Sequence, residues 1–106
     1  MEIHFHAHHA DVSAHMRKRA ERLVMRAAER IPRVVESIIR FEQDGPTRRV
    51  SIAMRAPRHR DLIGKGEGRF YGPALASAIA RVLAQSSKER MVLPRDRAHQ
   101  LARARA

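Results

Sequence analysis

The sequence contains no cysteine and no tryptophan, and its aromatic side chains are limited to three phenylalanines and one tyrosine. Without cysteine the chain has neither disulfides nor a thiolate metal site, so a reducing compartment is allowed. The small number of aromatic residues predicts a mainly aliphatic core. No run approaches the roughly 20 apolar residues of a membrane span, and residues 1–4 lack the pattern of a secretory signal. We therefore expect a cytoplasmic protein that does not use a membrane as a partner.

Acidic residues are too few to balance the charge of the chain. There are 11 Asp and Glu residues against 22 Lys and Arg, which leaves a formal net charge of +11. Only Lys18, Lys65 and Lys88 are lysine. The guanidinium forks of the remaining basic residues suit phosphate oxygens and stack on bases. A 106-residue chain of this kind predicts one domain that binds a polyanion, with nucleic acid favoured over an acidic membrane.

The first third of the chain predicts a strand followed by a helix. Residues 2–6 alternate polar and apolar side chains, as in a half-buried strand with Ile3 and Phe5 facing inward. Ser13 suits the N-cap of the helix, because its hydroxyl can accept a hydrogen bond from a free amide of the first turn. Pro32 ends the helix or follows its end. The apolar face of this helix consists of Met16, Ala20, Leu23, Val24, Ala27 and Ile31.

The rest of the chain predicts three strands and a second helix. Residues 34–41 are rich in β-branched side chains, a turn follows at 43–46, and residues 49–55 alternate strictly. Residues 62–70 are ambiguous. The glycines at 64, 66 and 68 either let another element pack very close to a strand or form a flexible loop. The second helix opens at Gly72-Pro73, and its core face consists of Leu75, Ala78, Ile79, Val82 and Leu83.

The expected fold is a two-layer α/β (α+β) sandwich with the order β-α-β-β-β-α. Two helices would cover one face of a four-stranded sheet and leave the other face in contact with water. That open face would carry His4, His6, Ser51 and Arg55 as the outward neighbours of core residues. We expect the domain to span residues 1–93, followed by a basic, flexible tail at 94–106.

A row of arginines is the main functional feature of the first helix. Arg22, Arg26 and Arg30 are spaced four apart, and like charges at this spacing repel by a few tenths of a kcal/mol per pair. Stability does not explain such a row, whereas a phosphate backbone does. Glu21 and Glu29 could make this an ordinary solvated face, but two carboxylates cannot neutralise six basic residues. Helical geometry adds Lys18 and Arg19 to the row.

On the second helix, the seven-residue spacing of Arg81 and Lys88 predicts a matching row of basic residues. Two roughly parallel helices would merge both rows into one positive surface. The sequence shows no aromatic pair placed for base stacking. This favours recognition of folded RNA by shape and backbone over reading of single strands.

With these residues, the chain resembles the ribosome hibernation-promoting factor and ribosome-associated inhibitor family in its short form (the sigma-54 modulation protein family). The resemblance covers about residues 1–90. In the first half it rests on Ile3 and Phe5, the cap Asp11-Val12-Ser13, and the basic Arg17 and Arg26. In the second half it rests on Gly64, Gly66, Ala74-Leu75, Ala78, Arg81-Val82, Gln85 and Lys88.

The resemblance implies a translation inhibitor that docks in the tRNA and mRNA channel of the small ribosomal subunit during stress or stationary phase. It implies ribosomal RNA contacts through Arg17, Arg22, Arg26, Arg81 and Lys88. We further expect Lys18, Arg19 and Arg30 to contribute from helical geometry. The expected protein is a monomer when free, with no cofactor and no small-molecule substrate.

Two other functions remain open from the sequence. One is a general RNA or DNA chaperone that has no preference for ribosomes. The other is a metal-binding module, since His4 and His6 would point the same way from a strand, with Asp11 as the only well-placed carboxylate. Polar filling of the wet sheet face is the favoured interpretation of these histidines. Enzymatic activity is not expected, because no convincing nucleophile, carboxylate pair or phosphate-loop spacing is present.

Overall fold

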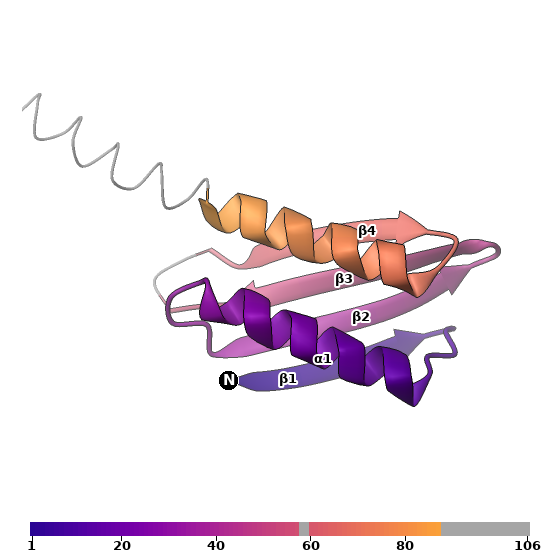
Figure 1. Cartoon of the computed structure of the whole chain (residues 1–106), viewed down its shortest axis with the longest axis horizontal. Helices are drawn as coiled ribbons and strands as arrows, with labels where there is room; N and C mark the ends of the chain where they lie inside the picture. Colours follow the sequence, from indigo (N-terminus) through magenta and orange to yellow (C-terminus); the bar gives the residue numbers. More distant parts are fainter. Residues whose placement is uncertain (58–59, 88–106) are drawn as a thin grey trace, which may run out of the picture.

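The computed structural model describes residues 1–57 and 60–87 of the chain (Figure 1). The order β-α-β-β-β-α and the α+β class that the sequence predicts are confirmed. The elements are β1 (Glu2–His8), α1 (Ala14–Glu29), β2 (Glu36–Asp44), β3 (Thr47–Arg55), β4 (Leu62–Gly68) and a second helix over residues 71–87. The predicted end of the domain at 93, the tail at 94–106 and Lys88 lie outside the described residues.

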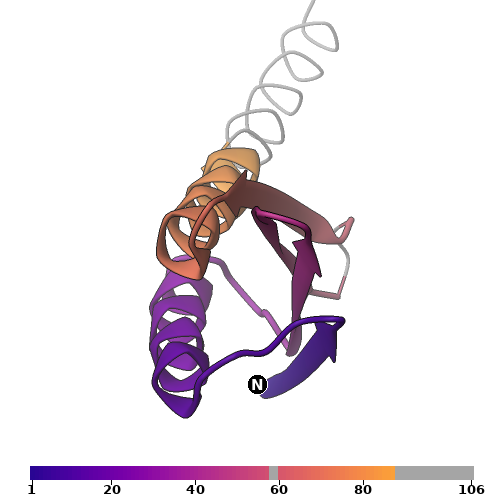
Figure 2. The same ribbon diagram turned by 90° about the vertical axis from the view of Figure 1, so that its right-hand side faces the viewer.

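The four strands form one mixed sheet in the order β1-β2-β3-β4. β1 runs parallel to β2, and the other neighbours are antiparallel. The parallel pair requires a crossover, and α1 supplies it. Both helices lie side by side on the same face of the sheet and run in the same direction, so the molecule has two layers (Figures 1 and 2).

The core lies between the helix layer and the inward face of the sheet. Alternation along β2 and β3 turns every second side chain toward the helices. The fully buried side chains of these strands are Ser37, Ile39, Phe41, Val50, Ile52 and Met54. From the helices, Ala20, Val24, Leu75, Ala78 and Val82 are fully buried against them.

The ambiguous segment at 62–70 is a strand that allows close packing. A Cβ atom on Gly64 would lie 2.1 Å from the carbonyl oxygen of Ala78, and one on Gly66 would lie 2.1 Å from that of Ala74. The backbone of the second helix therefore rests directly on β4, at a separation that only glycine permits. A Cβ atom on Gly68, at the end of the strand, would have its nearest neighbouring atom at 3.8 Å.

Some predicted boundaries and core positions need correction. The second strand begins at Glu36 rather than at 34, and the second helix begins at residue 71, so Pro73 lies within its first turn. Proline is accepted there because the first-turn amides have no partner inside the helix. Leu23, Ile79 and Leu83 are only partly buried, since they pack at the edge of the core. Among the described residues, no helix is long and apolar enough to cross a membrane.

Candidate nucleic-acid interface

The basic side chains of α1 are held by a helix with a well-defined start. Ser13 is the N-cap, and its hydroxyl accepts a hydrogen bond of 3.1 Å from the amide of Met16, as the sequence predicts. The buried Ala20, Val24 and Ala27 fix the rotation of the helix on the sheet. Because successive residues are about 100° apart, the same packing turns the basic residues outward. Exposed on α1 and its C-cap are Arg17, Lys18, Arg19, Arg22, Arg26 and Arg30.

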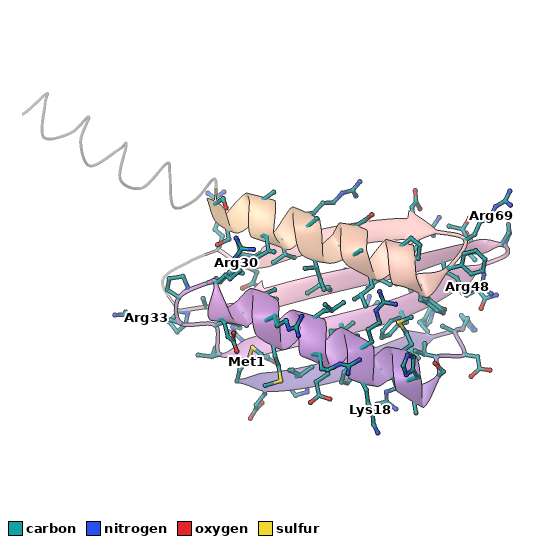
Figure 3. The ribbon with its side chains drawn as sticks, in the orientation of Figure 1. Met1, Lys18, Arg30, Arg33, Arg48 and Arg69 are labelled. Carbon is teal, nitrogen blue, oxygen red and sulfur yellow. The ribbon has the colours of Figure 1, made fainter. Side chains whose placement is uncertain are left out.

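These six side chains spread across the outer surface of α1. Arg17 lies over the ring of Phe5 in β1, 5.1 Å from the ring centroid, so it occupies the β1 side. Lys18 projects away from the second helix, whereas Arg30 points toward it (Figure 3). A terminal nitrogen of Arg19 lies beside Gly72, 3.6 Å from where a Cβ atom would be. Three- and four-residue spacing continues this flank from Arg19 through Arg22 and Arg26 to Arg30.

The arginine row formed by Arg19, Arg22 and Arg26 has no carboxylate partner in the part of the chain that the structure describes. Across residues 1–57 and 60–87, no ion pair joins any of the three to an acidic side chain. A cation in the last turn of a helix is favoured by the helix dipole, which accounts for Arg26. Arg19 and Arg22 lie further from the helix end and gain nothing from this effect. Their positive charge is therefore available to a ligand.

The second helix does not extend this row in its described part. Arg81 lies on the far side of the helix, where its guanidinium donates to the carbonyl oxygen of Lys65 in β4. Gln85, one turn later, accepts a hydrogen bond of 2.8 Å from the amide of Ile63. These two side chains cover the free edge of β4 instead of facing α1. The outward surface of the second helix carries the small side chains Ala76, Ala80 and Ala84.

The open face of the sheet contrasts with the helix layer. As the sequence predicts, it carries the exposed His4, His6 and Arg55. Two of its arginines are matched with acids across neighbouring strands: Glu36 lies opposite Arg55, and Arg49 lies between Glu42 and Glu67. Arg49 Nε is 3.2 Å from a carboxylate oxygen of Glu67. Opposite charges placed in this way stabilise a sheet and neutralise one another.

The histidines do not assemble a metal site in the described part of the chain. His4 Nε2 lies 3.2 Å from a carboxylate oxygen of Glu36 and 3.4 Å from one of Glu2. The carboxylates beside His4 are therefore those of Glu2 and Glu36. Within the described ranges, no group of three or more histidines and carboxylates could hold a metal ion.

A second group of basic residues lies at the start of the second helix, where no site was predicted from the sequence. Arg48 in β3 donates a hydrogen bond of 2.6 Å to the carbonyl oxygen of Arg69, and its guanidinium lies 5.8 Å from the centroid of the Tyr71 ring. Arg48 and Arg69 appear together at this end of the molecule in Figure 3. Between Arg69 and Tyr71, the side chain of Phe70 is 68% exposed. The available signal in the sequence was an aromatic residue beside an arginine, directly after the glycine-rich segment.

Solved structures with the same fold were found by comparison. A ribosomal subunit interface protein from Coxiella burnetii matches with a TM-score of 0.71 and 17% identity, over 86% of this chain and 99% of the other. The N-terminal domain of Protein Y from Thermus thermophilus matches with a TM-score of 0.73 and 16% identity, over 83% and 98%. This chain has their fold. No family model and no curated protein sequence matches it.

Proposed function

We propose that this chain is a non-enzymatic, ribosome-associated factor that binds small-subunit ribosomal RNA in the tRNA and mRNA channel and inhibits translation. The observation that carries the proposal is the arginine row of α1 (Arg19, Arg22 and Arg26), which forms no ion pair with a carboxylate within residues 1–57 and 60–87. The likeness in fold to a ribosomal subunit interface protein supports the choice of partner.

The distribution of charge indicates which face meets the RNA. α1 and its C-cap carry six basic residues and only Glu21 and Glu29 as acids, whereas Arg49 and Arg55 of the open sheet face lie opposite acids of neighbouring strands. Phosphate contacts supply affinity and fix orientation without reading sequence. The helix layer is therefore the proposed RNA-binding face. The exposed alanines of the second helix are small, so an RNA backbone could approach this part of the face closely.

Co-sedimentation with ribosomes on a sucrose gradient tests the proposal. The wild-type chain should migrate with small subunits or whole ribosomes, and Arg22→Glu/Arg26→Glu should remain at the top of the gradient. Both side chains are exposed, so the double variant should keep its fold and its thermal unfolding curve. If the wild-type chain stays with free RNA instead, it is a general RNA chaperone and the proposal fails.

A matched pair of variants separates the position of the charge from its amount. Arg22→Gln/Arg26→Gln and Arg40→Gln/Lys65→Gln each remove two positive charges, the first from α1 and the second from the open sheet face. Only the first pair should weaken ribosome binding. It should also lower the slope of log K against log salt by about 1.5, since each lost phosphate contact contributes about 0.7–0.9. Equal losses for both pairs would show that net charge alone drives binding.

A further inference from the structure

We infer that Phe70, together with Arg48, Arg69 and Arg19, forms a binding site for an unpaired nucleotide, in which the ring of Phe70 stacks on the base and the arginines bind the flanking phosphates. The inference rests on the proposed function in assuming that RNA is the ligand. It goes further in naming an unstacked base as the part of the RNA that this end of the molecule recognises.

The exposure of Phe70 requires an explanation. Its side chain is 68% exposed, more than any other large apolar side chain of the described residues. The next residue, Tyr71, is only 8% exposed and packs edge-to-face on Phe41, so the chain turns one ring into the core and leaves the other in water. A solvent-exposed aromatic beside cations is the arrangement that stacks on splayed bases of RNA.

The backbone around Phe70 is held from two sides. The guanidinium of Arg48 binds the carbonyl oxygen of Arg69 at 2.6 Å. The carbonyl oxygen of Phe70 accepts the first hydrogen bond of the second helix, from the amide of Ala74 at 3.4 Å. The ring therefore stands on a fixed joint between β4 and the helix. A stacking platform that is already ordered loses little entropy when a base binds.

Three arginines from different elements meet at this joint. Arg48 comes from β3, Arg69 follows β4, and Arg19 reaches Gly72 from α1. In the described ranges none of them forms an ion pair with a carboxylate. Arg19 also belongs to the arginine row of α1, so the site continues the proposed RNA-binding face. A phosphate backbone that follows the row would bring an adjacent unpaired base to Phe70.

The test compares two fluorescein-labelled RNAs: a stem with a loop of unpaired adenosines, and a blunt duplex with the same number of phosphates. The full chain should bind the stem-loop more tightly than the duplex. Phe70→Ala and Phe70→Leu should weaken stem-loop binding by about 5- to 150-fold, and both should leave duplex binding unchanged. Phe70→Trp should retain tight binding. Ile63→Ala, which truncates a 50% exposed apolar side chain on the open sheet face, is the control and should change neither RNA.

Three results would overturn the inference: Phe70→Leu binds the stem-loop as the wild type does, Phe70→Ala loses affinity equally for both RNAs, or the wild type shows no preference for the stem-loop. Ribosome co-sedimentation of the same proteins separates this failure from that of the proposed function. If the wild-type chain does not co-sediment with ribosomes, but Phe70→Ala weakens stem-loop binding as expected, only the ribosomal proposal is refuted. A chain that binds ribosomes without any Phe70 effect refutes only the stacking site.

Discussion

The close contact between β4 and the second helix can be tested with a single methyl group. In Gly66→Ala, the new Cβ would lie 2.1 Å from the carbonyl oxygen of Ala74 and 2.8 Å from the amide nitrogen of Ala78. Ordinary carbon–oxygen contacts are about 3.3–3.6 Å, so the helix and strand must separate by about 1.2–1.5 Å. Overpacking typically costs about 1–3 kcal/mol. The opposing atoms are backbone and cannot rotate away, so we expect the upper end of that range.

Urea unfolding followed by circular dichroism measures this loss, with Gly68→Ala as the matched control in the same strand. The nearest atom to a Cβ on Gly68 is at 3.8 Å, so this variant should stay within about 1 kcal/mol of the wild type. For a domain of this size, a loss of about 3 kcal/mol lowers Tm by about 12 °C. Equal stability of the two variants would show that the helix does not rest on the glycines of β4.

Two further predictions concern Tyr71 and the edge of β4. Burial raises the pKa of the Tyr71 hydroxyl above its ordinary 10.0; the charge of Arg48 opposes this shift and that of Asp11 reinforces it. Just above pH 10 the folded form therefore keeps a proton that the unfolded form has lost. Stability should therefore fall as the pH rises above 10 in urea titrations of the wild type, and it should fall less in Tyr71→Phe. This variant also removes a buried hydroxyl that has no hydrogen-bond partner among the described residues. Arg81→Ala/Gln85→Ala should uncover the backbone edge of β4 and cause concentration-dependent self-association in analytical ultracentrifugation, where a monodisperse monomer would contradict it.

The sequence predicts the fold well because its periodicities are strong and local. Alternation in β3 and the helical spacing in α1 place the core residues without any tertiary information. The glycines of β4 were ambiguous for a physical reason. A glycine that allows close packing and one that allows flexibility look identical until the packed partner, here the second helix, is located.

The candidate site could be predicted from the sequence only in part. The row on α1 follows from helical spacing, but the orientation of Arg81 depends on the position of the second helix over an edge strand. Arg48 and Arg69 are 21 residues apart and meet only because β3 pairs with β4. Phe70 continues the alternation of Leu62, Gly64, Gly66 and Gly68, which would turn it toward the core, but β4 ends at Gly68, so its exposure was not predicted.

Counting charged residues along the sequence does not locate the interface. Arg22 and Arg49 look equivalent in the sequence, and each has an acid nearby. On the helix, the neighbours of Arg22 at four residues' distance are Lys18 and Arg26, so the row reinforces its own potential. In the sheet, register places acids on both sides of Arg49. The same residue type thus lies between acids in the sheet and between bases on α1, because strand register sets its neighbours in one case and helical spacing in the other.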